Sequence, residues 1–388
     1  WVVRMVFSAM EQMGEVPFKT VLIHGLVRDE QGRKMSKSLG NGIDPLEVIK
    51  DYGADALRLT LITGNAPGND MRFYYSRMDN SRNFGNKLWN AARFVMMHIG
   101  DSEPKLDKSK LTSADKWILS KVNTLAKEVT DNLDNYELGI AVQKVYDFIW
   151  DEYCDWYIEM AKSRLYSENK QEKAQVCYVL NYVLRNSLKL LHPFMPFVTE
   201  EIYCTLNPDE DSIMIAAWPK ETEDFAYAED EAAVEMMKEA VRSIRGVRTS
   251  MNVPPSKKAS VFVVTEDTSV QEIFRNGAVF FATLAGASEV HVQADKAGIA
   301  DDAVSAVIPQ ATIYIPFAEL VDLEKEIARL EKEEERLTKE IARSNGMLGN
   351  PNFINKAPEA KVQAEKEKLA NYQQMMEQVQ TRLEQLKK

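Results

Sequence analysis

The stretch GRKMSKSLGN, residues 32–41, is a short basic segment that decides how the start of this sequence is interpreted. It holds three cations, two hydroxyls, a glycine near each end and no acid, namely Arg33, Lys34, Lys37, Ser36, Ser38, Gly32 and Gly40. Cations can neutralise phosphate oxygens, and glycines let a loop bend and close. The composition indicates a loop for a polyanion, although a solvated basic turn has the same composition and the pattern of a P-loop is missing.

The segments on either side of this basic loop predict an α/β arrangement. Before it, KTVLIHGLVRD (19–29) reads as a short buried strand because residues 21–23 form an apolar run. After it, Asp44 can cap a helix that Pro45 begins and Gly53 ends. A loop between a strand and the start of a helix is where α/β proteins bind phosphates, through free backbone N–H groups and the helix dipole.

The composition as a whole is that of a soluble multidomain protein. The sequence has 388 residues, 45% of them hydrophobic and 28% charged, without an apolar run of about 18 residues that could span a membrane. It opens on Trp1 without the pattern of a signal peptide, so we expect the chain to begin inside a larger, cytoplasmic protein. Its three cysteines and four histidines are dispersed, so we expect buried thiols and no metal site.

The charge pattern is compatible with nucleic-acid binding at local basic patches. The net charge of -11 argues against binding by bulk charge. Residues 242–258 nevertheless carry five cations and no acid, which gives +5: Arg242, Arg245, Arg248, Lys257 and Lys258. Residues 72–93 carry five cations against one acid, which gives +4. We therefore predict that Arg245, Arg248, Lys257 and Lys258 contact RNA phosphates.

Helical spacing dominates the middle of the sequence. An amphipathic helix over 76–99 would bury Phe84, Leu88, Ala91, Ala92 and Val95. Further helices are predicted over 54–63, 114–132, 138–167, 171–191, 196–206, 231–248 and 268–285. Strands are predicted over 259–265, 288–293 and 311–317. Residues 113–206 thus favour a helix bundle, and residues 231–317 favour a small α+β domain.

The last seventy residues carry a heptad pattern in two halves. Leucine and isoleucine recur at steps of three and four from Leu320 to Ile341, with only Glu334 breaking the seam. The pattern returns from Val362 to Leu386, after the loop GNPNFINKAP (349–358). Two such helices joined by a Gly/Pro loop predict an antiparallel coiled coil, which buries little surface by itself and needs a partner for order.

The basic loop resembles a known signature. KMSKS at 34–38, followed by LGN, is similar to the signature loop of class I aminoacyl-tRNA synthetases. The resemblance implies that Lys34, Met35, Ser36, Lys37 and Ser38 bind ATP, with Mg²⁺ expected. It also implies that Lys37, assisted by Lys34, stabilises the transition state in which an amino-acid carboxylate attacks the α-phosphate and pyrophosphate leaves.

Other segments narrow the resemblance. NFGNKLWNAARF (83–94) and LLHPFMPFVTEEIY (190–203) resemble the valine, isoleucine and leucine enzymes, and MNVPPSKK (251–258) together with 349–372 is similar to the bacterial valine family. The resemblance implies valine, ATP and tRNA(Val) as ligands, a monomer, and no structural metal. An isoleucine enzyme is the alternative within the class, but it would usually end in a cysteine zinc module, which this chain lacks.

We accordingly predict a multidomain, mainly α chain in five parts. They are a remnant of the α/β Rossmann-like catalytic domain (1–70), a stem-contact segment (71–112), an anticodon-binding helix bundle with a connector (113–230), a small α+β domain (231–317) and a coiled-coil tRNA-binding arm (318–388). The family also needs an H-x-G-H signature before the lysine loop. HIGD (98–101) follows the loop and IHGL (23–26) does not fit, so we expect the chain alone to make no adenylate.

Two other classes of function fit the sequence less completely. The chain could be a tRNA-binding module without catalysis, which differs from the ligase only in what is encoded upstream. It could also be a structural protein that dimerises through its heptad helices. Sedimentation separates this last alternative from an intramolecular hairpin, since only a dimer depends on concentration.

Overall fold

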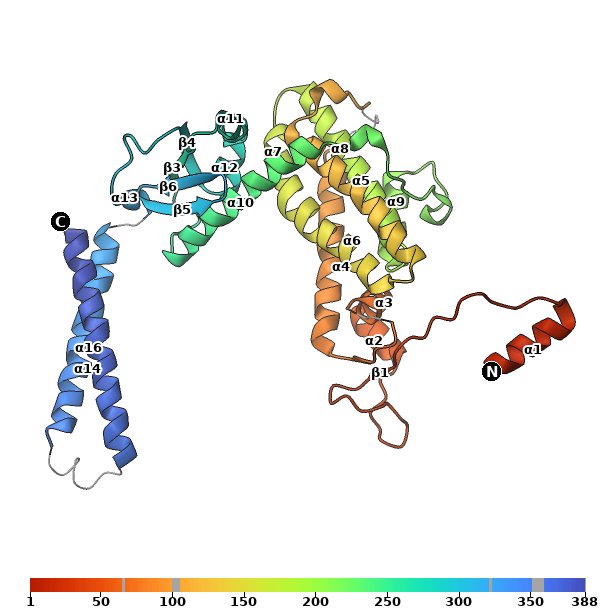
Figure 1. Ribbon diagram of the computed structural model, residues 1–388, viewed down its shortest axis with the longest axis horizontal. Helices are drawn as coiled ribbons and strands as arrows, with labels where there is room; N and C mark the ends of the chain where they lie inside the picture. Colours follow the sequence, from red (N-terminus) through yellow and green to blue (C-terminus); the bar gives the residue numbers. More distant parts are fainter. Residues whose placement is uncertain (65–66, 100–104, 321–322, 351–358, 388) are drawn as a thin grey trace. The chain divides into compact units, whose positions relative to one another are not determined.

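The computed structural model describes residues 1–64, 67–99, 105–320, 323–350 and 359–387. The chain divides into two compact units, Trp1–Met236 and Met237–Lys388 (Figure 1). The finer division into five parts stays a prediction. Among the described residues, no helix combines the length and apolar character needed to cross a membrane.

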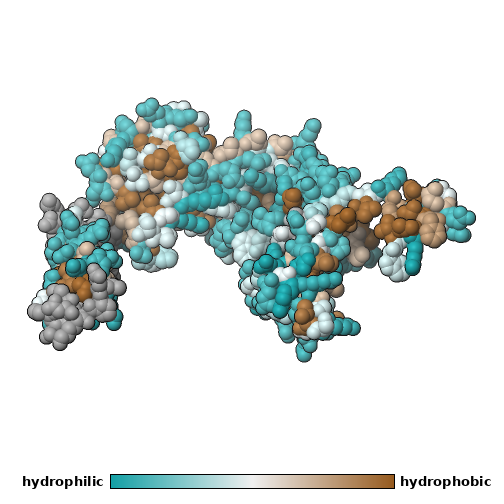
Figure 2. Space-filling model, turned by 60° about the horizontal axis from the view of Figure 1, so that its bottom comes forward, coloured by the Kyte–Doolittle hydropathy of each residue, from teal (hydrophilic) through white to brown (hydrophobic). Residues whose placement is uncertain are grey.

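The chain begins with an exposed helix. α1 (Val2–Met13) has no buried residue, and Gly14 ends it in a left-handed conformation. Its apolar side chains face solvent, Trp1, Val3 and Met13 among them, and they give the N-terminal segment a brown surface in Figure 2. α1 therefore adds nothing to the hydrophobic core within the described chain.

The strand predicted over 19–29 is the main error at this end of the chain. Only β1 (Val27–Arg28) forms, paired in parallel with β2 (Met71–Arg72). Val21, Leu22 and Ile23 are exposed, so the apolar run is not buried within the described chain. A strand needs a neighbour for its backbone groups, and in the described part of this unit β1 pairs only with β2 and with an isolated bridge at Lys34.

The two helices after the basic loop form as predicted. Asp44 caps α2 (Pro45–Tyr52) by accepting a hydrogen bond from the N–H of Leu46 at 2.8 Å. Gly53, with φ of 90°, ends α2 and leads into α3 (Ala54–Ile62). α2, α3 and the start of the next helix share a small hydrophobic cluster, made of Val48, Ala56, Phe73 and Met78.

A helix bundle follows, and its helices match the predicted spans to within three residues at each end. The elements are α4 (Tyr75–Met96), α5 (Ser113–Asp134), α6 (Leu138–Asp147), a π-helix (Phe148–Tyr157), α7 (Ile158–Leu165), α8 (Lys170–Leu191) and α9 (Pro196–Leu206). Phe84, Leu88 and Val95 of α4 are fully buried, as the helical spacing predicts. Short 3₁₀ turns follow at Ile213–Ile215 and Glu223–Phe225, and another precedes α5 at Lys108–Lys110.

One predicted helix, 138–167, is divided by the π-helix. Wider turns there accommodate the bulky side chains Tyr153, Trp156 and Tyr157, which are buried. Tyr157 donates to buried Asp115 of α5 at 2.7 Å, and Arg164 of α7 donates to the other oxygen of the same carboxylate. Asp115 also completes a capping box with Thr112, so a single buried carboxylate fixes α5 against α7.

The second unit contains a four-stranded sheet. α10 (Ala228–Ser250) leads into it, and the strand order is β4-β3-β6-β5. The elements are β3 (Ala259–Val264), α11 (Thr268–Asn276), α12 (Ala278–Leu284), β4 (Ala287–Gln293), β5 (Val304–Ile308), β6 (Ala311–Ile315) and α13 (Phe317–Leu320). β3 pairs with β4 in parallel and with β6 antiparallel, and β5 pairs with β6 antiparallel.

Two details of this sheet differ from the prediction. β5 was not predicted, because VSAVI contains small residues and only a weak alternation. The single helix predicted over 268–285 is broken at Gly277, where a Cβ atom would lie 1.9 Å from the sulfur of Met237. A larger residue at 277 would therefore push the Met237 side chain of α10 aside, and Gly277 separates α11 from α12.

The last two helices form an antiparallel pair. α14 (Leu323–Leu348) and α16 (Glu359–Lys387) lie side by side (Figure 1), and the loop between them falls largely outside the described residues. Gln380 donates to Glu334 at 2.9 Å and Ser344 donates to Glu365 at 2.7 Å, a register that runs antiparallel. The residue that interrupts the heptad seam, Glu334, therefore has a polar partner on the opposite helix. Coiled-coil packing of the pair stays a prediction.

Candidate nucleotide loop and nucleic-acid contacts

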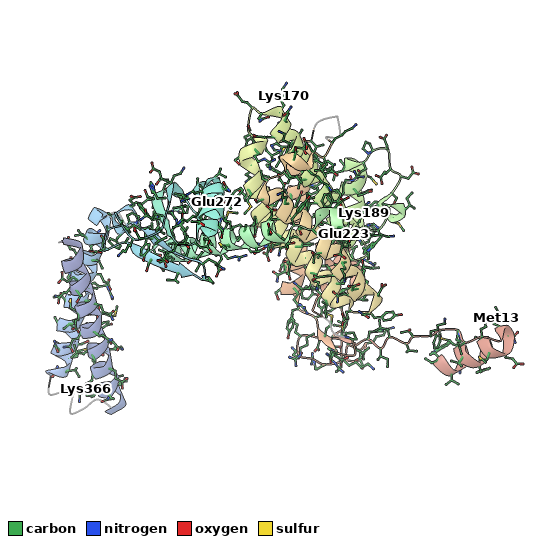
Figure 3. All side chains as sticks on the ribbon, turned by 45° about the horizontal axis from the view of Figure 1, so that its top comes forward. Met13, Lys170, Lys189, Glu223, Glu272 and Lys366 are labelled. Carbon is green, nitrogen blue, oxygen red and sulfur yellow. The ribbon has the colours of Figure 1, made fainter. Side chains whose placement is uncertain are left out.

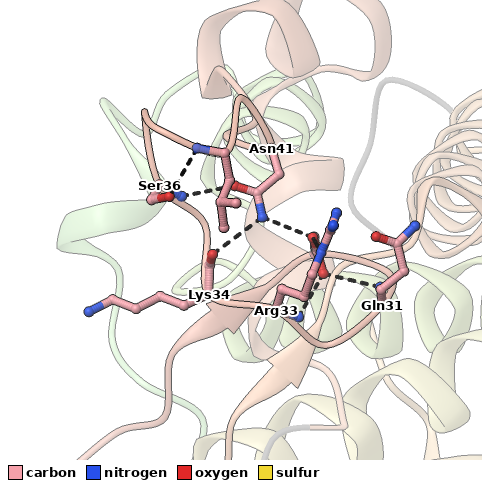
Figure 4. A network of polar contacts seen from close by, with 7 residues as sticks. Gln31, Arg33, Lys34, Ser36 and Asn41 are labelled. Carbon is pink, nitrogen blue, oxygen red and sulfur yellow. Dashed lines mark hydrogen bonds and ion pairs between the residues drawn. The ribbon is translucent and has the colours of Figure 1, made fainter.

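The basic loop is held at its base by the carboxylate of Asp29. Asp29 is 8% exposed, and its carboxylate accepts four hydrogen bonds (Figure 4). Oδ1 accepts from the N–H groups of Gln31 at 3.1 Å and Arg33 at 2.7 Å. Oδ2 accepts from Arg33 Nε at 2.7 Å and from Asn41 Nδ2 at 2.9 Å. The bonds from Asn41 and Arg33 lower the pKa of Asp29 to about 2, so the carboxylate stays charged.

Asn41 joins the two sides of the loop. Its amide nitrogen donates to Asp29 and also to the carbonyl of Lys34 at 3.2 Å. Its amide oxygen accepts from the N–H of Ser36 at 2.9 Å. One side chain thus fixes the backbone on both sides of Met35, while an isolated β-bridge pairs Lys34 with Arg28 of β1.

The two glycines of the loop have left-handed backbones. Gly32 has φ of 79°, and a Cβ atom there would lie 3.0 Å from the guanidinium of Arg72. Gly40 has φ of 61°, and its N–H donates to the carbonyl of Lys37 at 3.3 Å. Since L side chains rarely adopt these angles, both turns favour glycine.

Met35 points away from solvent. Its side chain packs against the hydrophobic cluster of Val48, Ala56, Phe73 and Met78. The prediction that Met35 contributes to an ATP site is not tested by this contact. The packing does assign the Met35 side chain a second role, because it pins the loop to the helices beneath it.

The other predicted site residues lie at the surface. Lys34, Lys37 and Ser38 are exposed, and Lys34 extends away from the polar network in Figure 4. Ser36 and Ser38 share a hydrogen bond of 3.2 Å between their hydroxyls. Neither lysine forms an ion pair with another residue in the described part of the chain, so both charges are available to an anion.

The predicted RNA-contact residues divide into two kinds. Arg248 is 9% exposed and donates to the carbonyls of Pro254 at 3.1 Å and Lys257 at 2.5 Å, and burial lowers its pKa. Arg245 donates from Nε to the carbonyl of Leu284 at 2.7 Å, although its side chain is partly exposed. Lys258 is exposed and Lys257 is half-buried. Arg248 therefore shapes the loop that presents the two lysines.

Asp29 and Asn41 are the site residues that sequence reasoning missed. Asn41 stands in the LGN that follows the motif, and Asp29 ends the predicted strand, so both were visible as neighbours of the loop. Their contact spans twelve positions and depends on the path of the loop, which spacing alone does not reveal. Elsewhere in the described residues, no group of three or more His, Cys, Asp or Glu residues is arranged to hold a metal ion.

Comparison with known proteins finds family models that match three parts of the chain. Three family models match: "tRNA synthetases class I (I, L, M and V)" over residues 1–74, "Anticodon-binding domain of tRNA ligase" over 115–263, and "Valyl tRNA synthetase tRNA binding arm" over 322–387. The second match continues past residue 230, where the sequence analysis ended the anticodon-binding part. Together the three matches extend from the basic loop to the helical arm.

Curated relatives match over the full chain. Valine--tRNA ligases of Clostridium tetani and Clostridium perfringens are 52% and 50% identical, each over 100% of this chain and 44% of their own length. The Bacillus cereus enzyme (strain ATCC 10987) is 46% identical over the same shares. Among solved structures, a LeuRS-tRNA-LeuAMS ternary complex from Agrobacterium radiobacter K84 aligns at 19% identity with a TM-score of 0.46, covering 67% of this chain and 28% of that chain.

The match to the class I model, over the segment that contains the anchored basic loop, defines the chain as part of a class I aminoacyl-tRNA synthetase. Within that class it belongs to the valine--tRNA ligase family, of which it represents a C-terminal portion. The chain spans about 44% of the length of the relatives that it matches.

Proposed function

We propose that this chain supplies the lysine loop and the tRNA-binding parts of an enzyme that attaches valine to tRNA(Val) at the expense of ATP. The observation that carries the proposal is an anchored loop whose two lysines are exposed and form no ion pair with the described residues. The chain that holds this loop is 52% identical to a valine--tRNA ligase over all of its own residues. The relatives named in the comparison are all valine enzymes, which favours valine over isoleucine.

The chemistry proposed for the loop is charge stabilisation. A carboxylate oxygen of valine attacks the α-phosphorus of ATP, the bond from that phosphorus to the bridging oxygen breaks, and pyrophosphate leaves. Negative charge grows on the departing phosphates, and Lys37, assisted by Lys34, neutralises it. The hydroxyl at the 3′ end of tRNA then attacks the valyl carbonyl carbon, and AMP leaves.

The polar groups of the loop fit a triphosphate. Two ammonium groups and the hydroxyls of Ser36 and Ser38 are donors to phosphate oxygens. Residues 32–41 contain no carboxylate, and the nearby carboxylate of Asp29 is already used by four donors. Mg²⁺ would therefore be held by phosphate oxygens and by groups other than this loop.

The tRNA contacts are proposed for the rest of the chain. The bundle would bind the anticodon region, and Lys257 and Lys258 would contact phosphates from the loop that Arg248 holds. Arg245 would add a further cation, and the helical arm of α14 and α16 would contact the tRNA elsewhere. We propose a cytoplasmic monomer, in which the arm pairs within one chain.

The experiment is ATP–pyrophosphate exchange by the full-length enzyme that contains this chain. Lys37→Ala should lower the exchange rate by about 100-fold or more, the scale of losing one transition-state charge contact, and leave tRNA affinity nearly unchanged. Lys50→Ala, an exposed lysine of α2, is the matched control. Normal exchange by Lys37→Ala would remove that residue from its role. A wild-type enzyme that binds tRNA but exchanges nothing would favour a binding module.

A further inference from the structure

We propose that Asn41 and Asp29 are positioning residues that divide the basic loop into a fixed half, ending at Ser36, and a moving half, Lys37–Gly40. The proposal rests on the proposed function, since it assigns separate tasks to the two lysines of the same loop. It goes further by naming two residues outside the five-residue signature on which the placement of Lys37 depends.

The fixed half is held from three directions. Asn41 bonds to the backbone of both Lys34 and Ser36, at 3.2 and 2.9 Å. The β-bridge between Lys34 and Arg28 holds the loop to β1. Between these points the side chain of Met35 packs into the hydrophobic cluster below. The backbone of Lys34 therefore occupies a defined position before any ligand arrives.

Asp29 makes this arrangement rigid. Asn41 could rotate if it were held only by the loop, but its amide nitrogen also donates to Asp29 Oδ2 at 2.9 Å. Asp29 in turn accepts hydrogen bonds from Gln31 and Arg33, which precede Lys34 in the sequence. Asp29 is 8% exposed, so its carboxylate is largely shielded from water.

The moving half has far fewer restraints. Lys37, Ser38, Leu39 and Gly40 are all exposed. Its bonds are local: Gly40 N–H to the carbonyl of Lys37 at 3.3 Å, Leu39 N–H to the hydroxyl of Ser36 at 3.3 Å, and the contact between Ser36 and Ser38. Gly40, with its left-handed backbone, is a hinge on one side, and Ser36, held by Asn41, is the pivot on the other.

The kinetic consequence differs for the two lysines. Lys34 is placed in advance and contributes to binding of ATP, whereas Lys37 reaches the phosphates by rotation of the moving half about the pivot. Loss of the pivot misplaces Lys37 in the transition state without removing any charge. The change should therefore lower kcat more than it raises KM for ATP, since only the transition state needs the full contact.

The experiment compares variants of the full-length enzyme in ATP–pyrophosphate exchange. Asn41→Ala and the isosteric Asn41→Asp, which cannot donate to Asp29, should each lower kcat by about 100-fold, the effect of displacing a reacting group by roughly 1 Å. Asp29→Asn should lower it less, because its oxygen still accepts. When Asp29→Asn is combined with Asn41→Asp, an amide nitrogen at position 29 can donate to a carboxylate at position 41. The double variant therefore regains one hydrogen bond and should recover part of kcat. Glu30→Gln, a neighbouring exposed acid, is the control.

A second readout needs no catalysis. Trypsin cuts after Arg33, Lys34 and Lys37, and its rate reports opening of the loop in the chain itself. Asn41→Ala and Asp29→Asn should raise cleavage after Arg33 and Lys34 by about tenfold, the factor for one or two lost hydrogen bonds, whereas cleavage elsewhere should keep its wild-type rate. Uniformly faster cleavage would mean general unfolding and would count against a positioning role.

The outcomes separate this inference from the proposed function. If Lys37→Ala abolishes exchange while Asn41→Ala and Asp29→Asn leave kcat unchanged, the ligase assignment holds and the positioning role is wrong. If Lys37→Ala itself exchanges normally, the role of Lys37 fails, and the division of tasks between the two lysines fails with it. If the wild-type enzyme binds tRNA but exchanges nothing, the proposed function fails first. If the Asn41 variants raise only KM for ATP, the network serves ground-state binding and the division into fixed and moving halves is overturned.

Discussion

The carboxylate of Asp55, on α3, accepts a hydrogen bond of 2.7 Å from the backbone N–H of Val198, at the start of α9. It accepts a second bond from the N–H of Phe197 at 3.2 Å. The residue at the N-cap of α9, Met195, offers no side-chain cap, so Asp55 caps this helix from another element. One turn further along α3, Arg58 donates to the carbonyls of Pro193 and Phe194. α3, the second helix after the basic loop, therefore holds the turn between α8 and α9.

Loss of this cap should loosen the junction between α3 and the bundle. We expect Asp55→Ala to lower the free energy of unfolding of the first unit by about 1–2 kcal/mol, since the helix loses a charged cap with two backbone donors. Urea unfolding followed by circular dichroism measures the change. Asp51→Ala, an exposed acid at the end of α2, is the matched control. Equal effects of the two substitutions would show that Asp55 does not act as a cap.

Acid should weaken the base of the lysine loop in a defined range of pH. Hydrogen bonds from Asn41 and Arg33 depress the pKa of Asp29 to about 2, from 3.8. A carboxyl whose pKa is lower in the folded state stabilises the fold above its unfolded value, and this contribution disappears as pH falls from about 4 through 2. The difference in stability between wild type and Asp29→Asn should be constant from pH 7 to 5 and should shrink below pH 4.

Urea midpoints of the two proteins over this range measure that difference. The wild-type chain must keep its helical circular dichroism at each pH, so that only the local contribution changes. A difference that persists undiminished at pH 2 would mean that Asp29 is protonated in the same range in both states. The negative charge of Asp29 would then contribute nothing to stability.

Local signals predicted the helices well because their determinants are local. Asp44, Pro45 and Gly53 lie within ten residues and specify both ends of α2. The strand over 19–29 was wrong for the opposite reason, since an apolar run indicates burial only if a partner is present to cover it. The π-helix was likewise missed, because it follows from how Tyr153 and Tyr157 pack against distant helices.

The candidate site could be predicted from the sequence only where its signal is local. Lys34 and Lys37 carry a signature that is visible in five consecutive letters, and the structure places both at the surface. Counting charge could not reveal that Arg248 turns inward to two carbonyls. A formal charge in a sequence has no direction, and only the folded chain distinguishes a cation that faces solvent from one that shapes a loop.

Salt dependence should separate these two kinds of cation. Phosphate contacts release counterions, so each one adds about 0.7–0.9 to the slope of log affinity against log salt. In tRNA binding by the chain, Lys257→Ala and Lys258→Ala should each flatten the slope by about this amount. Arg248→Gln should weaken binding with little change in slope, because the guanidinium is buried against the carbonyls of Pro254 and Lys257. A slope flattened equally by Arg248→Gln would place that guanidinium on a phosphate instead.

The helical arm should behave as a hairpin within one chain. Leu337 of α14 is fully buried, and Ser344 bonds to Glu365 of α16 across the pair. Leu337→Ala removes buried apolar surface and should cost about 3 kcal/mol of stability, measured as lost helical signal on heating. Lys366→Ala is the control, since that side chain is exposed on α16 (Figure 3). Because both partners of the buried seam come from one chain, sedimentation should give the monomer mass at every concentration. A dimer that dissociates on dilution, and that Leu337→Ala abolishes, would show instead that the helices pair between chains.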